Sequence, residues 1–114
     1  FFASMFIDVK KMKKISRKDT KPNDTWIWLE LKGHTTQGWL YGTKSDFIAF
    51  ELKKGWLLVQ PSHLIALAED IVDHTKWVDD PYEAQYKLYS RKGKNDIITL
   101  LETKEIKKIG TVWR

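Results

Sequence analysis

Glu30 and Lys32 are the residues of this sequence whose types and spacing are best suited to chemistry. They stand two positions apart at the end of the stretch 25–32, so a β-strand there would direct both side chains to one face. Charged residues are depleted from strands, and here they interrupt an apolar pattern. A carboxylate beside an ammonium could hold a divalent metal ion through Glu30 and a phosphate or a water molecule through Lys32.

The strand that must position this pair has two different sides. Ile27, Leu29 and Leu31 alternate along one side, which predicts that this side enters the core. Trp26 and Trp28 alternate along the other side and precede the charged pair there. The pair is therefore expected at the end of an aromatic sheet face.

The surrounding elements predict an α+β fold. Apolar patterns predict strands over 5–15, 25–32, 86–91 and 96–101, a hairpin over 46–60, and helices over 62–73, capped by Ser62, and over 103–109, capped by Thr103. Gly38 and Gly42 are interpreted as turn residues on either side of a short aromatic segment. Together these elements predict one mixed sheet of about six strands with one or two covering helices.

A hairpin is expected to bring a second carboxylate to the pair. Residues 16–24 contain turn-forming residues and no apolar anchor, so they are interpreted as the tip between strands 5–15 and 25–32. The register of that hairpin would place Asp8 near the end of the second strand that carries Glu30.

Asp8, followed on the next strand by Glu30-Leu-Lys32, resembles the motif of the PD-(D/E)XK nuclease superfamily. The sequence around these residues is similar to that of small phage-type nuclease-like proteins. The resemblance implies a restriction-endonuclease-like core, with Asp8 and Glu30 as ligands of Mg²⁺ or Mn²⁺ and Lys32 positioning the attacking water. It also implies DNA as the partner and the cytoplasm of a bacterial or phage-infected cell as the location.

The sequence departs from that family at two places. Ile7 rather than proline precedes Asp8, and only seven residues precede Asp8, so the family's usual N-terminal helix has no counterpart. A fragment, a compact variant and a helix borrowed from a partner subunit stay open as explanations.

A rival triplet consists of Asp46, Glu51 and Lys53. In a strand over 46–53 the two carboxylates would point to opposite faces, so they could share a metal ion only across a bulge. The triplet of Asp8, Glu30 and Lys32 has no such conflict. A surface ion pair on a sheet face is the plain alternative for it.

The charge pattern favours an anionic partner. The net charge is +5, with a cluster of cations between residues 10 and 21 and a second at 87–94. We expect Lys10, Lys13, Lys14, Arg17 and Lys18 to contact phosphates, although a solvated loop is the ordinary explanation of such a run. Trp39 and Tyr41 are the candidates for base stacking, with core packing as their alternative.

Several classes of protein are excluded. The chain has no cysteine, so disulfides and thiolate metal sites are absent, and its three histidines lack the spacing of zinc ligands. No serine stands in a nucleophile elbow. No apolar run approaches the ~18 residues of a membrane span. The opening residues lack the basic start and cleavage site of a signal peptide.

The 114 residues predict a single domain, and three hypotheses describe its function. They are a metal-dependent DNA endonuclease, a non-catalytic nucleic-acid-binding module, and a phage-type structural or interaction protein. Salt-sensitive DNA binding would separate the third from the others, and metal-dependent cleavage would separate the first from the second. Phe1, Phe2 and Phe6 would leave apolar surface exposed, which predicts a homodimer that covers it.

Overall fold

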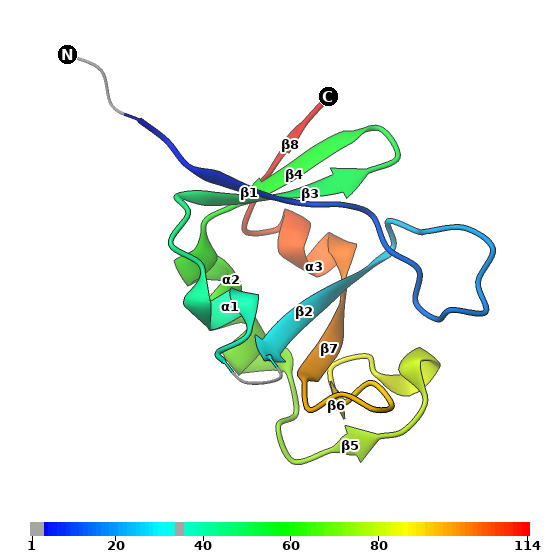
Figure 1. Ribbon diagram of the computed structural model, residues 1–114. Coiled ribbons are helices and arrows are strands. Elements are labelled where there is room, and N and C mark those ends of the chain that lie inside the picture. Colours follow the sequence, from blue (N-terminus) through cyan, green and yellow to red (C-terminus); the bar gives the residue numbers. More distant parts are fainter. Residues whose placement is uncertain (1–3, 34–35) are drawn as a thin grey trace.

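The computed structural model describes residues 4–33 and 36–114 and shows an α+β fold with two mixed four-stranded sheets (Figure 1). The first sheet has the strand order β1-β3-β4-β8, and the second has the order β2-β7-β6-β5. The fold class is as predicted, but the single sheet of about six strands is wrong. The elements are β1 (Ile7–Lys10), β2 (Trp26–Lys32), α1 (Trp39–Gly42), β3 (Phe47–Leu52), β4 (Gly55–Val59), α2 (Pro61–Ile71), β5 (Trp77–Val78), the 3₁₀ turn η1 (Pro81–Glu83), β6 (Leu88–Tyr89), β7 (Ile97–Glu102), α3 (Thr103–Lys107) and β8 (Thr111–Trp113).

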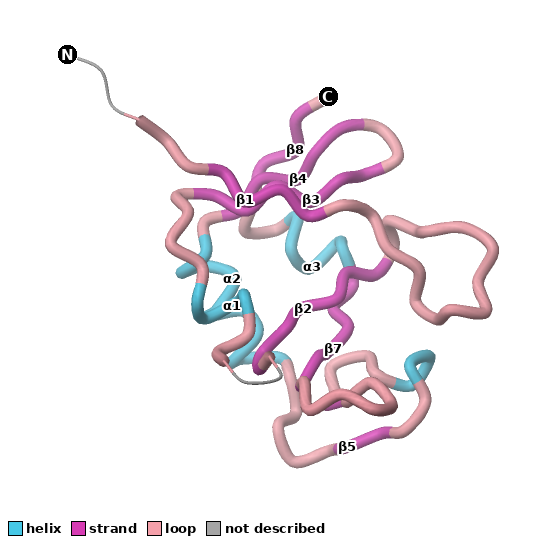
Figure 2. Tube along the Cα trace, viewed as in Figure 1, coloured by secondary structure: helices cyan, strands magenta, loops and turns pink. Residues whose placement is uncertain are grey.

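The predicted pairing of the first two strands is wrong. β1 runs parallel to β3, with Asp8 opposite Ile48, and β2 pairs antiparallel with β7 in the other sheet. Residues 11–25 form a long loop between β1 and β2 (Figure 2), and so long a connection does not hold its flanking strands together. Within this loop, Lys13 forms an isolated antiparallel bridge with Asn23, which closes the hairpin locally and away from β1.

Two carboxylates at the ends of β3 hold β1 in place. The backbone N–H of Phe6 donates to Asp46 at 2.8 Å, and that of Met12 donates to Glu51 at 3.0 Å. Phe6 precedes β1 and Met12 follows it, so both ends of this edge strand are tied to β3. Asp46 and Glu51, which the sequence offered as a rival metal pair, stand five residues apart on an extended chain, about 16 Å along the strand.

The hairpin over 46–60 is confirmed as β3 and β4, with Ile48 opposite Val59. Its turn ends at Gly55, whose φ of 109° lies in the left-handed region. A Cβ atom there would stand 2.0 Å from the carbonyl oxygen of Trp113, so glycine is also needed for β8 to lie beside β4.

The core lies between the two sheets and includes the predicted side of β2. Leu29 is fully buried, and Ile27 and Leu31 pack against the core cluster. From the first sheet, Ile48 and Leu57 enter the same cluster. Burial of such side chains is the main contribution that holds the sheets together.

The helices lie on the side of the first sheet that faces the second sheet (Figure 1). The helix predicted over 62–73 is present as α2. Its N-cap is Gln60 rather than Ser62, because Pro61 occupies the first helical position. The helix predicted over 103–109 is present as the shorter α3. Its N-cap is Glu102, and the predicted cap, Thr103, instead donates its hydroxyl to the backbone oxygen of Asp24 at 2.5 Å.

Other boundaries also differ from the predictions. The strand expected over 5–15 is limited to β1, that over 86–91 to β6, and the loop expected at 73–83 contains β5 and η1. The aromatic segment after Gly38 forms the short helix α1, so Gly38 is its N-cap and Gly42 its last residue rather than turn residues. In the described part of the chain, no helix is long and apolar enough to cross a membrane.

Candidate functional site

Asp8 and Lys10 lie on the inner face of the first sheet, because their partners on β3 are the buried Ile48 and Phe50. The Lys10 ammonium is 3.4 Å from the Asp8 carboxylate. The same ammonium stands 4.5 Å from the ring centroid of Trp39, which is a cation–π contact. Lys10, for which we expected a phosphate contact, is thus engaged within the protein.

Glu30 lies near the end of β2, where a close approach of backbone brings α1 against it. A Cβ atom on Gly38 would stand 2.3 Å from the Glu30 carbonyl oxygen, so only glycine fits there. The next residue, Trp39, donates its backbone N–H to the Glu30 carboxylate at 3.3 Å. The other Glu30 carboxylate oxygen is 4.0 Å from Arg91.

The predicted ligands Asp8 and Glu30 therefore belong to different sheets but both lie near Trp39. Asp8 is linked to it through the Lys10 ammonium, and Glu30 through the Trp39 backbone. Each carboxylate already faces a cation, Lys10 on β1 for Asp8 and Arg91 in the turn after β6 for Glu30. Across residues 4–33 and 36–114, no group of three or more His, Cys, Asp or Glu side chains could hold a metal ion. Both carboxylates thus take part in ion pairs, which were the plain alternative for these residues.

Lys32 is placed differently from the expectation. A β-bulge lies between Glu30 and Lys32, since Glu30 pairs with Ile98 and Lys32 with Ile97. A bulge changes the direction of the side chains that follow it, so the simple same-face relation of the two residues does not hold. Lys32 is exposed and forms a backbone bridge with Gln37.

Sequence reasoning missed an ion pair beside Glu30 that joins a buried carboxylate to a partly exposed arginine. Asp96 is only 3% exposed, and it accepts hydrogen bonds from the Arg91 backbone N–H at 3.0 Å and from the Arg91 Nε at 2.6 Å. The Arg91 Nη2 lies 2.5 Å from the same carboxylate. The two residues flank the turn around Gly93, whose φ is 79°, and this turn was the sequence signal that could have paired them.

The basic loop, defined as residues 13–21, carries the expected cations on its surface. Its exposed cations are Lys13, Lys14, Arg17, Lys18 and Lys21. None of the ion pairs found among the described residues involves them. Their charges are therefore available to an external anion.

Asp19 holds the basic loop in shape. It accepts hydrogen bonds from the backbone N–H groups of Ile15 at 3.1 Å and Ser16 at 3.2 Å. Its second carboxylate oxygen accepts a hydrogen bond from the hydroxyl of Tyr82, which lies in η1, 63 residues later in the sequence. The hydrogen bond from Tyr82, followed by the one from Ser16, lowers the pKa of Asp19 below its ordinary value.

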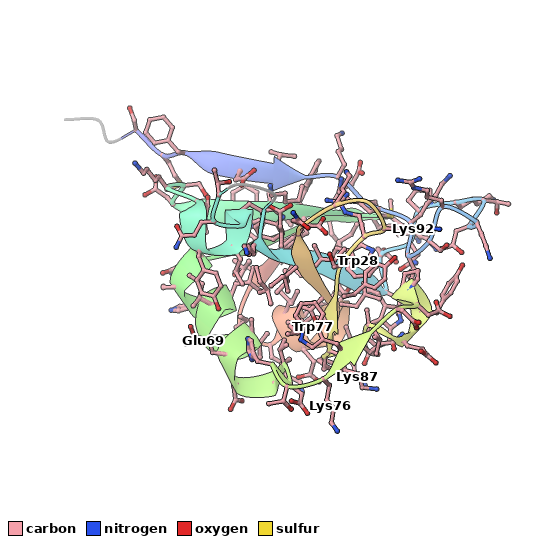
Figure 3. The ribbon with its side chains drawn as sticks, turned by 60° about the horizontal axis from the view of Figure 1, so that its bottom comes forward. Trp28, Glu69, Lys76, Trp77, Lys87 and Lys92 are labelled. Atoms are coloured by element: carbon pink, nitrogen blue, oxygen red, sulfur yellow. The ribbon has the colours of Figure 1, made fainter. Side chains whose placement is uncertain are left out.

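Trp28 joins the basic loop to a second basic segment, the 90–96 turn. The Trp28 indole N–H donates to the backbone oxygen of Lys14 at 3.1 Å, and its ring lies 5.8 Å from that of Tyr89. Tyr89 ends β6 and leads into the turn that carries Arg91, Lys92 and Lys94. Figure 3 shows Trp28 and Lys92 on the same side of the molecule.

Trp39 and Tyr41, the residues expected to stack on bases, pack against the core instead. The Trp39 ring lies 6.0 Å from the ring of Phe50. Burial raises the pKa of Tyr41, and the nearby carboxylate of Glu69 on α2 adds to this effect. The structure thus places both rings at the inner side of α1, where core packing was the alternative.

Replacing Tyr82 by phenylalanine is expected to loosen the basic loop and to return the Asp19 pKa toward its ordinary value. Because the folded-state pKa is lowered, this tether stabilises the loop above the ordinary carboxyl range and is lost as pH falls through the lowered pKa. An NMR titration of the Asp19 carboxyl carbon and amide exchange at Ile15 and Ser16 measure both effects. Tyr89→Phe is the matched control, and an unchanged Asp19 titration in Tyr82→Phe would refute the tether.

Comparison of this chain with protein-family models, curated proteins and solved structures found no match.

Proposed function

We propose that this protein binds DNA through its phosphate backbone, using the basic loop and the 90–96 turn. The observation that supports this most directly is the basic loop itself, whose five exposed cations are held on a loop with defined hydrogen bonds. Protein cations that neutralise phosphates release condensed counterions, and this release drives association without base recognition.

The order within the loop favours affinity. Side chains and loops that must be immobilised on binding oppose association, and a loop already fixed by Asp19 and Trp28 avoids part of that loss. Arg17 adds a planar guanidinium, which can make two hydrogen bonds to one phosphate. The 90–96 turn adds Lys92 and Lys94 shortly after Tyr89, whose ring contacts Trp28. A phosphate backbone lying along Trp28 would therefore meet cations from both segments.

In this proposal the protein is a nucleic-acid-binding module of the cytoplasm of a bacterial or phage-infected cell, and it acts without catalysis. Asp8 and Glu30 stabilise the junction between the two sheets through Lys10 and Arg91 rather than by binding a metal ion. The proposed binding surface then lies beside this junction, because Arg91 belongs to the 90–96 turn.

Metal-dependent hydrolysis of DNA by a restriction-endonuclease-like core is the second candidate. One observation favours it, because two partly exposed carboxylates that resemble the superfamily motif lie around one residue, Trp39. Asp8 and Glu30 have 29% and 27% of their side-chain surface exposed, so an ion in solution could reach either one. This candidate requires Lys10 to leave Asp8.

The test is a pair of assays on the same protein. We expect wild type to bind a DNA duplex in EDTA, with an affinity that falls steeply between about 50 and 200 mM salt. A plasmid nicking assay with Mg²⁺ and with Mn²⁺ is expected to show no cleavage.

Glu30→Gln separates the two candidates. Cleavage by wild type that is lost in Glu30→Gln, with DNA affinity retained, would overturn the non-catalytic proposal in favour of the second candidate. Equal cleavage in both proteins would indicate a contaminant or another site, and Asp46 and Glu51 would be tested next. Absence of salt-sensitive binding would refute both candidates and favour a structural or interaction protein.

A further inference from the structure

The outer face of the first sheet is apolar. Alternation and pairing place the buried residues of β3 and β4, such as Ile48 and Leu57, on the inner face. The residues between them, and their partners on β1 and β8, form the outer face, which consists of Ile7, Val9, Phe47, Ala49, Trp56, Leu58 and Trp113, with Lys11, Glu51 and Thr111 at its margins. Ile7 is 45% exposed, Val9 52% and Trp113 63%.

Such a face is unusual for a sheet surface in water. An antiparallel sheet with one solvated face normally carries polar residues there, and here the outer face is apolar across four strands. The three α-helices lie on the opposite side of this sheet, and Figure 1 shows only strands and their connections on the outer side in the described chain. The side chains of Trp56 and Trp113 lie opposite each other across β4 and β8.

The charges on this face favour a second copy of the chain as its occupant. Lys11 stands 3.8 Å from Glu51 and 5.8 Å from the ring centroid of Trp56, so its charge is compensated on the face itself. The chain carries a net charge of +5, and the basic loop and the 90–96 turn hold many of its exposed cations. Two like-charged molecules would meet with least repulsion through a neutral face.

The area available also fits a dimer of moderate affinity. With about 200 Å² for a large side chain, the exposed part of Trp113 alone is about 130 Å². The whole face, together with the exposed Met5 that leads into β1, offers roughly 600 Å², at the lower end of specific interfaces, which bury about 600–1,000 Å² per partner.

We propose that two copies of this chain associate through the outer face of the first sheet, forming a symmetric sheet-on-sheet dimer. Of the residues from which a homodimer was expected, Phe1 and Phe2 lie outside the described residues, and Phe6 is 67% exposed. Association through the outer face leaves the basic loop of each copy free, and it holds whether or not the protein binds DNA.

Sedimentation equilibrium of the full chain tests the dimer. From about 5 to about 300 µM, the average mass is expected to rise from 13.5 kDa toward twice that value. Association should be stronger at about 500 mM than at about 50 mM salt, because salt screens repulsion between like-charged copies. Salt has the opposite effect on DNA binding, so the two proposals fail or succeed separately.

Val9→Glu and Trp113→Glu are each expected to weaken association more than tenfold, because each buries an unpaired carboxylate in the contact. Trp77→Glu is the control, since Trp77 is 56% exposed and lies in the second sheet. Thermal unfolding of all three variants tests whether each one is folded. If Val9→Glu is not folded, Trp113→Glu, which lies near the chain end, tests the contact. A monomer at the highest concentration in both salts, or an equal loss in Trp77→Glu, would overturn the proposal.

Discussion

Replacing Lys13, Lys14 and Arg17 together by alanine is expected to weaken DNA binding about a hundredfold at low salt. The three side chains are exposed on the basic loop, and none takes part in the ion pairs found among the described residues. Each lost phosphate contact removes one released counterion from the binding equilibrium. The slope of log affinity against log salt should therefore decrease by about 0.9 for each contact, or about 2.7 in all.

The control must change net charge by the same amount at another place. Replacing Lys104, Lys107 and Lys108 by alanine also lowers the net charge from +5 to +2, since three cations are removed in each variant. These lysines lie on or directly after α3. Fluorescence anisotropy with a labelled duplex at two salt concentrations compares the variants. Similar losses in both would mean that overall charge, and not the basic loop, attracts DNA.

Replacing Arg91 by alanine is expected to destabilise the folded protein by about 3 kcal/mol, because it leaves a buried carboxylate with little compensation. Asp96 is 3% exposed, and the Arg91 side chain supplies its Nε hydrogen bond and its closest cation. Among the residues that the structure describes, only the backbone N–H of residue 91 would then donate to it. For a domain of this size, the loss corresponds to a decrease in Tm of about 12 °C.

Lys92→Ala is the matched control for Arg91→Ala, because it removes a neighbouring exposed cation from the same turn. Its effect should stay within about 0.5 kcal/mol. Urea denaturation of both variants, with Asp96→Asn and the double variant, gives the coupling between the two residues. If Arg91→Ala and Asp96→Asn were additive and mild, the ion pair would not be important for stability.

Several elements could be predicted from the sequence because their signals are local. The alternation of Ile27, Leu29 and Leu31 identified the buried side of β2, and each position follows from the twofold repeat of one strand. The turn before Gly55 joins two apolar runs, so the hairpin of β3 and β4 was also predictable. α2 was found from its 3.6-residue spacing, with a cap shifted from Ser62 to Gln60.

The candidate site could be predicted only in part. Sequence reasoning identified Asp8, Glu30 and the basic loop as residues of interest, but the metal site depended on a hairpin between β1 and β2. That hairpin does not form, because β1 is held to β3 by Asp46 and Glu51, carboxylates about 40 residues away in the chain. No periodicity within β1 itself records this partner.

The sequence by itself therefore determined the α+β class, the inward face of β2 and the positions of the cations, since these depend on neighbouring residues. Only the tertiary structure decided which strands pair, which separates Asp8 and Glu30 into two sheets and places Lys10 and Trp39 between them. It likewise decided that Tyr82 holds Asp19 across 63 residues of sequence. Such contacts depend on loop closure and on competition among several possible partners, which local patterns do not specify.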